Sequence, residues 1–196
     1  ETLYRIVKAV RDAVPAQFPV SAKIRLGYDD TSLALDNAKA IAEAGASSLA
    51  IHARTKSDGY RPPAYWPWIA KIKQQVKIPL VANGEIWNAE QALLCQQQSQ
   101  CQDIMLGRGA LAMPNLARHI RDQAAPLLWP EVLALLMHYS EFEIAGDKGK
   151  YYANRVKQWF SYLKLQYPEA QQLFSQLRIL TKSRDILQLL EQQRSH

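Results

Sequence analysis

Cysteine is scarce in this sequence, and long apolar runs are absent from it. Only Cys95 and Cys101 occur among the 196 residues, and their spacing, CQQQSQC, fits no common zinc or redox motif. Such a composition is not typical of a disulfide-stapled secreted domain, so we expect a cytoplasmic protein with structural thiols and no metal. No apolar run approaches the roughly 18 residues that a membrane-spanning helix needs. The amphipathic N-terminal segment does not have the pattern of a signal peptide, and we expect no membrane partner.

Basic residues outnumber acidic ones, but not evenly along the chain. Lysine and arginine total 24 against 18 aspartates and glutamates, a net charge of +6 that weakly favours an anionic partner. Residues 126–147 contain no lysine or arginine, whereas residues 148–184 contain eight of them and one acidic residue, Glu169. Such segregation is typical of a nucleic-acid-binding surface, although a helix whose basic side chains simply face solvent explains the same pattern.

Between residues 19 and 121, two hydrophobic periods alternate. Short apolar runs predict strands at residues 19–26, 47–53, 78–82 and 102–107. Helical spacing fills the intervals, at residues 32–45, 66–76 and 88–98. Parallel neighbouring strands need a crossover connection, which a helix supplies. The alternation therefore predicts an α/β fold with a parallel sheet, either a barrel or a doubly wound sheet.

Each predicted strand ends in polar or glycine residues, which would be costly in a core. These residues are Lys23 on the first strand, His52 on the second, Asn83, Gly84 and Glu85 on the third, and Gly107 and Arg108 on the fourth. Ligands bind at the carboxyl ends of the strands in such folds, and bare glycine amides beside a guanidinium suit a phosphate. Any one of these residues is more often an ordinary rim residue, but the four ends together predict a phosphorylated organic cofactor.

From about residue 129 the strand patterns stop and helical spacing continues. We expect helices at residues 129–145, 150–167, 168–181 and 183–193. The chain therefore divides into an α/β part, residues 1–126, and a helical domain, residues 127–196. On the second helix, Arg155 and Tyr162 lie on one flank of an apolar stripe and Lys157 lies on the other. Arginine forks and tyrosine rings can bind RNA phosphates and splayed bases.

Four segments of the chain resemble the tRNA-dihydrouridine synthases: KIRLGYDD, IHARTKSDGYR, VANGEIW and IMLGRGAL with a later PNL. The tail NRVKQWFSYLKLQYPEA is similar to that of the bacterial C-type subfamily, and the resemblance covers nearly the whole chain. It implies the C-terminal half of an FMN-binding TIM (β/α) barrel, followed by an all-helical tRNA-recognition domain. The implied reaction is NADPH-dependent reduction of a tRNA D-loop uridine, at position 16 in this subfamily, by a protein that is monomeric when complete.

The resemblance also implies roles for individual residues. Seven would bind the flavin: Lys23 and His52 at its ring or substrate face, Asn83, Gly84 and Glu85 at its ribityl and phosphate side, and Gly107 and Arg108 at its phosphate. Five would contact tRNA: Tyr60 in the loop after the second strand, and Arg155, Lys157, Tyr162 and Arg178 in the tail.

One departure from the family pattern concerns the proton donor. In this family a cysteine in an N-x-G-C-P type motif protonates the uracil, and the sequence contains no such motif. With four strand–helix units instead of eight, we expect the second half of the barrel, a catalytic cysteine upstream, and a fragment that is inactive by itself. Two alternatives remain. One is another FMN-dependent barrel oxidoreductase that acts on a small pyrimidine, and the other is a non-catalytic RNA-binding fragment.

Overall fold

The computed structural model describes residues 1–145 and 151–194. The chain forms two compact units, Glu1–Gly107 and Arg108–His196. This division falls before the boundary expected between residues 126 and 127, because α5 (Arg108–Ala112) and α6 (Leu116–Asp122) group with the helical unit. The functions expected of the two parts stay predictions.

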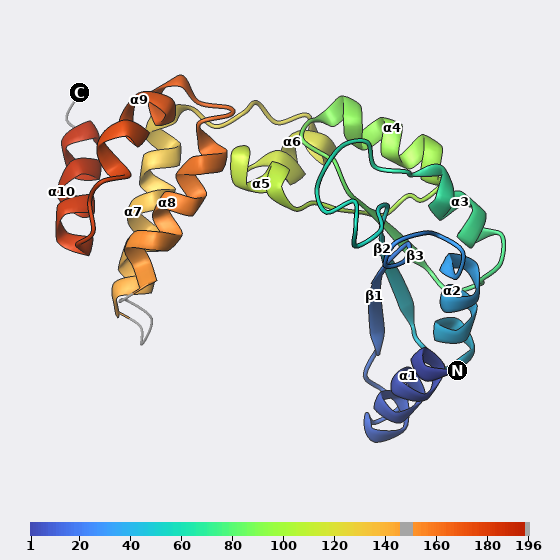
Figure 1. Cartoon of the computed structure of the whole chain (residues 1–196). Helices are drawn as coiled ribbons and strands as arrows, with labels where there is room; N and C mark the ends of the chain where they lie inside the picture. The colour runs from blue at the N-terminus through green and yellow to red at the C-terminus, as the bar shows by residue number, and fades with distance from the viewer. Residues whose placement is uncertain (146–150, 195–196) are drawn as a thin grey trace. The chain divides into compact units, whose positions relative to one another are not determined.

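The first unit alternates helices and strands as the sequence patterns predict. Its elements are α1 (Thr2–Ala13), β1 (Ser21–Arg25), α2 (Ala34–Glu43), β2 (Ser48–His52), α3 (Pro67–Lys73), β3 (Leu80–Asn83), α4 (Ala89–Ser99) and β4 (Ile104–Met105). The four strands form one parallel sheet in the order β1-β2-β3-β4 (Figure 1). The α/β class with a parallel sheet is therefore confirmed.

The strand order follows the chain order without a reversal. Crossovers between parallel strands are right-handed, so successive crossovers in one direction place their helices on the same face of the sheet. Figure 1 shows α2, α3 and α4 in a row along the sheet. A doubly wound sheet would reverse its order part-way and carry helices on both faces. The observed order is therefore that of a singly wound parallel sheet.

The two faces of the sheet differ in chemistry. Partners in register across parallel strands point their side chains to the same face, and side chains alternate along each strand. Leu49 and Ile51 of β2 therefore share a face with Leu80 and Ala82 of β3, and all four are buried. This is the face that packs under the helices. The opposite face carries the polar residues of the strand ends.

The second unit is entirely helical in its described residues. After α5 and α6 come α7 (Trp129–Ala145), α8 (Tyr152–Leu163), α9 (Pro168–Leu177) and α10 (Ser183–Arg194). The last four match the expected helices to within a few residues, whereas the short helix α5 was not expected. Its backbone carbonyl at Leu111 accepts a hydrogen bond from the indole N–H of Trp159 on α8, at 3.0 Å. Among the described helices, we find none whose length and apolar character would let it span a bilayer.

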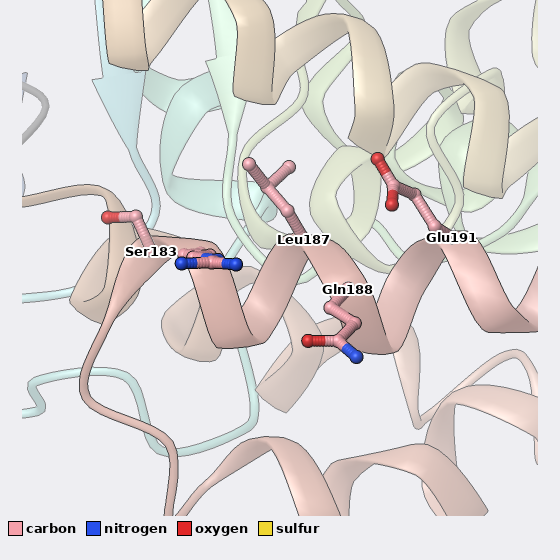
Figure 2. Close-up of a pocket in the computed structure, with 5 residues that line it drawn as sticks. Ser183, Leu187, Gln188 and Glu191 are labelled. Atoms are coloured by element: carbon pink, nitrogen blue, oxygen red, sulfur yellow. The ribbon is translucent and has the colours of Figure 1, made fainter.

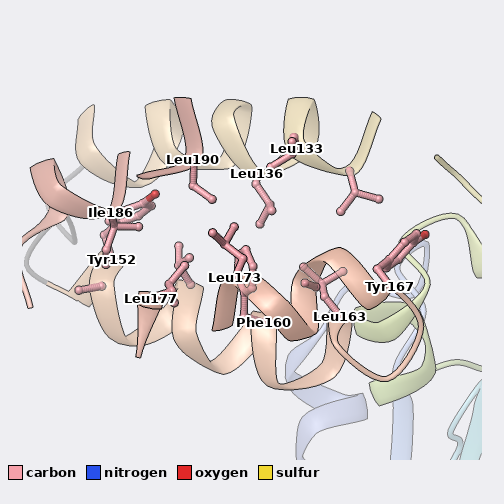
Figure 3. Packing of buried hydrophobic residues seen from close by; sticks show 14 residues of the cluster. Leu133, Leu136, Tyr152, Phe160, Leu163, Tyr167, Leu173, Leu177, Ile186 and Leu190 are labelled. Carbon is pink, nitrogen blue, oxygen red and sulfur yellow. The ribbon is translucent and has the colours of Figure 1, made fainter. Parts of the chain in front are cut away.

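A hydrophobic core fixes the position of α8 (Figure 3). Buried residues recur every three or four positions along α8, which is the spacing of one helix face: Tyr152, Val156, Phe160 and Leu163. They pack against Leu133 and Leu136 of α7, Leu173 and Leu177 of α9, and Ile186 and Leu190 of α10. The Trp129 ring meets the Phe160 ring edge-on, with centroids 6.2 Å apart. The apolar stripe predicted for this helix is confirmed, although Trp159 is only partly buried.

Candidate functional site

A row of side chains crosses the sheet at the carboxyl ends of its strands. Arg25 of β1 is in register with His52 of β2, which is in register with Asn83 of β3, and Asn83 with Met105 of β4. Lys23 lies two residues before Arg25, so it shares the same face. This face is opposite to the one that the helices cover. The sheet thus brings two cations, an imidazole and an amide to one edge.

The turn after β3 packs against His52. Gly84 has φ of +122°, and a Cβ added there would lie 3.0 Å from Cδ2 of His52 and 3.3 Å from Cβ of Ala64. The Gly84 carbonyl accepts a hydrogen bond from the indole N–H of Trp66 at 2.9 Å. Glycine is therefore required at this position by the backbone conformation and by the packing of the chain itself. The imidazole of His52 is buried at the same place.

Glu85, the next residue, has a left-handed backbone with φ of +55°. Its carboxylate accepts a hydrogen bond from Nη2 of Arg54 and another from the indole N–H of Trp87, the latter at 2.9 Å. Arg54 also donates from Nε to the Pro63 carbonyl at 3.1 Å. Both carboxylate oxygens of Glu85 therefore have partners within the chain, and these bonds hold a turn that an L-amino acid rarely adopts.

Arg54 has no exposed surface, and the sequence patterns assign it no role in the site. Its Nη1 has no hydrogen-bond partner among the described residues. A buried donor without a partner costs about 1–3 kcal/mol. In the sequence, Arg54 stands out only because it lies two residues after His52, where a predicted strand ends. Its burial and its pairing with Glu85, 31 positions away, cannot be predicted from local spacing.

Asn83 and Gly107 differ in what the chain itself demands of them. The Asn83 side-chain amide donates to the Met105 carbonyl at 2.7 Å, so it helps join β3 to β4. A Cβ added at Gly107 would meet nothing within 4 Å, and the residue is exposed. Neither packing nor turn geometry therefore explains a glycine at position 107. Arg108 follows it directly and begins the second unit as the first residue of α5.

The two cysteines lie away from this edge. Cys95 is on α4, and Cys101 precedes β4 at its amino end, and both are buried. Burial raises the pKa of the Cys95 thiol to about 12, and burial also raises the pKa of Cys101. Both thiols therefore stay protonated near neutral pH, as structural residues do. Within the part of the chain that the structure describes, no group of His, Cys, Asp or Glu side chains is arranged to hold a metal ion.

The predicted tRNA contacts fall in both units. Tyr60 in the first unit is 60% exposed. In the second unit, Arg155 and Tyr162 lie on one flank of α8 and Lys157 on the other, and all three are partly buried. Arg178 is exposed at the carboxyl end of α9. The structure thus does not gather these residues on a single face of one helix. Of the basic segment, residues 148 and 150 lie outside the described residues.

Two surface cavities are formed along α10, within the second unit. One, of about 610 Å³, is lined by Ser183, Arg184, Leu187, Gln188 and Glu191 (Figure 2). The other, of about 400 Å³, is lined by residues of α9, α10 and the turn between them. Figure 2 shows the labelled side chains spread along one helix, without a group of convergent polar atoms. We therefore do not consider these cavities a reaction site.

Comparison with known proteins identifies the family of this chain. The sequence model described as dihydrouridine synthase (Dus) matches residues 1–195. The chain belongs to the dihydrouridine synthase family. It is 52% identical to the tRNA-dihydrouridine(16) synthase of Shewanella oneidensis, with all of this chain and 62% of that protein aligned. It is 47% identical to the protein of that name from Vibrio cholerae (99% and 60% aligned) and 45% identical to the one from Escherichia coli K12 (97% and 61% aligned).

The dihydrouridine synthase relatives are longer than this chain. It spans about three fifths of the length of the proteins that it matches. The family resemblance inferred from the four strand-end segments is confirmed, and the parallel sheet carries those segments to one edge.

Proposed function

We propose that this chain is the C-terminal portion of a flavoenzyme that reduces a uridine of tRNA to dihydrouridine, at position 16, with NADPH as the reductant. Membership of the dihydrouridine synthase family supports the reaction, and the names of the relatives support the position. The observation that carries the proposal is the polar row Arg25–His52–Asn83, with Lys23 beside it, on the face of the sheet that is opposite to its helices.

The residues at this edge fit FMN. The site has the exposed Lys23 and the buried imidazole of His52 on one face of the sheet. It also has main-chain amides in the turn after β3 and in the segment after β4. Gly107 supports the fit most directly, because a glycine that the chain itself does not require is suited to close approach by a ligand. When bound, the flavin supplies the hydride chemistry, and the task of the protein is to orient and tune it.

We assign the roles of these residues from the family resemblance and from the bonds that Asn83 and Glu85 already make within the chain. Lys23 and His52 would face the flavin ring and the uracil. Asn83, Gly84 and Glu85 would act on the ribityl and phosphate side mainly through the main chain of the turn, because the amide of Asn83 and the carboxylate of Glu85 already have partners in the chain. Gly107 and the guanidinium of Arg108 would hold the phosphate, as bare amides and an arginine fork can.

The proton for the uracil would come from a cysteine outside this sequence. Cys95 and Cys101 are unsuitable, because their thiols are buried and held protonated by burial, away from the polar edge. A barrel also needs further strands beside β1, which is the last strand at one side of the sheet. The exposed apolar side chains Ile6, Val10 and Phe18 lie on α1 and the connection to β1, and they are suited to contact such strands and helices.

Binding of tRNA would use both charged side chains and aromatic stacking. Arg155, Lys157 and Arg178 would neutralise phosphates, and Tyr60 and Tyr162 would contact bases. The helical core holds α8 firmly enough to present such side chains, since five buried residues anchor it.

The test uses the full-length protein that contains this chain. The purified protein should carry FMN, identified by its absorbance after release, and should oxidise NADPH in the presence of tRNA that lacks dihydrouridine. Free uridine and free uracil should support no oxidation. Turnover with the free pyrimidine and not with tRNA would instead indicate a small-molecule oxidoreductase, and tRNA binding without flavin would indicate a binding protein.

A further inference from the structure

The loops that follow β1 and β2 are joined by main-chain hydrogen bonds. Leu26 N–H donates to the Arg54 carbonyl at 3.1 Å, Lys56 N–H to the Gly27 carbonyl at 2.9 Å, and Ser57 N–H to the Tyr28 carbonyl at 2.9 Å. The Ser57 hydroxyl also donates to the Asp29 carboxylate. These bonds continue the pairing of β1 with β2 beyond the strand ends. The two loops therefore form one connected surface at the carboxyl edge of the sheet.

Arg25 holds the second loop in place. Its Nη1 donates to the Thr55 carbonyl at 2.7 Å and to the Gly59 carbonyl at 3.0 Å. Its guanidinium carbon lies 5.3 Å from the centroid of the Tyr60 ring, a distance at which a cation attracts the face of an aromatic ring. The His52 ring is 6.0 Å from the same ring. The Tyr60 ring is therefore contacted by two fixed side chains and is still 60% exposed.

Tyr28 is the counterpart of Tyr60 on the first loop. It is 71% exposed, and its carbonyl accepts one of the bonds that join the loops. The two loops thus present two large aromatic side chains at the edge that also carries Lys23 and His52. A tyrosine ring provides a broad stacking surface at a low cost in conformational entropy.

The charges around these tyrosines nearly balance. Arg25, Lys56 and Arg61 supply three positive charges, Asp29, Asp30 and Asp58 supply three negative ones, and Lys23 at the same edge leaves a net charge of +1. Asp58 is fixed in the loop, since it accepts the Thr55 N–H at 2.8 Å. A surface with so small a net charge attracts phosphates weakly, whereas stacking of a base on tyrosine does not depend on charge. The surface therefore fits unstacked bases better than an RNA backbone.

We propose that Tyr28 and Tyr60 form a base-stacking surface for the unpaired nucleotides next to the target uridine, with Arg25 as the positioning residue that holds Tyr60. The inference rests on the proposed function, because it takes tRNA as the partner. It adds Tyr28 to the RNA contacts expected from the sequence and gives Arg25 a positioning role behind Tyr60. It also separates the two tyrosines by chemistry from the basic residues of the helical tail.

The experiment measures tRNA affinity, flavin content, and kcat and KM for the full-length protein at several salt concentrations. Tyr28→Ala should weaken tRNA binding by about 5- to 150-fold, the range for loss of one base stack. The slope of log affinity against log salt and the flavin content should not change. Tyr28→Phe, which keeps the ring, should bind like the parent. Phe142→Ala is the matched control, an exposed aromatic residue on α7 to which no RNA contact is assigned.

A double-mutant cycle tests the role of Arg25. Arg25→Lys keeps the charge but loses the planar fork, so it should raise KM for tRNA more than it lowers kcat. The same change should have little further effect in a Tyr60→Ala background, because Arg25 acts through Tyr60. Additive losses would overturn the positioning role.

Two outcomes separate the inference from the function on which it rests. If the parent protein forms dihydrouridine and Tyr28→Ala binds tRNA equally well, or if its salt slope falls as for a lost phosphate contact, the stacking surface is wrong and the proposed function stands. If the parent protein neither binds nor modifies tRNA, the proposed function fails, and this inference fails with it.

Discussion

Arg54 and Glu85 form an ion pair that joins the loop after β2 to the turn after β3. The arginine side chain is fully buried, and the glutamate side chain is 20% exposed. The second carboxylate oxygen of Glu85 accepts the indole N–H of Trp87, so the carboxylate is held from two sides. Glu85 therefore has a structural task that its position in the NGE motif did not indicate. It stabilises the left-handed backbone conformation of the turn.

Removal of the Glu85 carboxylate should destabilise the protein. Glu85→Ala leaves the Arg54 charge buried without its partner, and loss of one member of a buried pair costs about 3 kcal/mol or more. The measurement is urea unfolding of the full-length protein. Glu90→Ala, at an exposed position in the first turn of α4, is the control and should unfold near the parent midpoint. Equal midpoints for Glu85→Ala and the parent would show that the pair contributes nothing.

The two rim glycines should respond differently to alanine. Gly84→Ala should lower both stability and flavin content, because φ is +122° and the new Cβ would lie 3.0 Å from the His52 ring. Gly107→Ala should leave stability unchanged, because its Cβ meets nothing within 4 Å, but should weaken flavin retention if a phosphate lies against that backbone. Flavin absorbance after dialysis and thermal unfolding separate the two effects. Full flavin retention in Gly107→Ala would remove this residue from the site.

Cys95 should make the protein more sensitive to alkaline pH. Burial raises the pKa of its thiol to about 12 from an ordinary value of 9.0, so the folded state favours the protonated form. This contribution to stability is present in full below about pH 9 and is lost as the pH rises from there toward 12. In Cys95→Ala, the free energy of unfolding should therefore fall less steeply between pH 9 and 11 than in the parent. Parallel curves would contradict the assignment.

The basic tail should contribute to tRNA binding through phosphates. Arg155→Ala, Lys157→Ala and Arg178→Ala should each weaken binding and reduce the slope of log affinity against log salt by about 0.7–0.9. Tyr162→Ala should weaken binding by about 1–3 kcal/mol with little change in slope, if its ring stacks on a base. Lys71→Ala, an exposed lysine on α3, is the control. Flavin content should stay the same throughout. If all four variants bind like the parent at every salt concentration, the tail is only a structural element.

The sequence predicted the elements well where hydrophobic periods are long, and poorly where the structure depends on distant pairs. The strands and the helices α2, α4, α7 and α8 follow from periods of 2 and 3.6 residues. Helix α5 was missed, because five residues that contain Gly109 give no clear period. The register of His52 with Asn83 could be expected from parallel pairing, but the bond from Asn83 to the Met105 carbonyl could not. These contacts are fixed by tertiary packing and leave no local pattern.

The most direct test of the account is to incubate the full-length protein with NADPH and an unmodified tRNA transcript, and then to map dihydrouridine along the RNA. We predict one dihydrouridine, at position 16, formed by protein that carries FMN and accompanied by oxidation of NADPH. A transcript with cytidine at that position should remain unchanged. Dihydrouridine at another position, or none with flavin-loaded protein, would contradict the account.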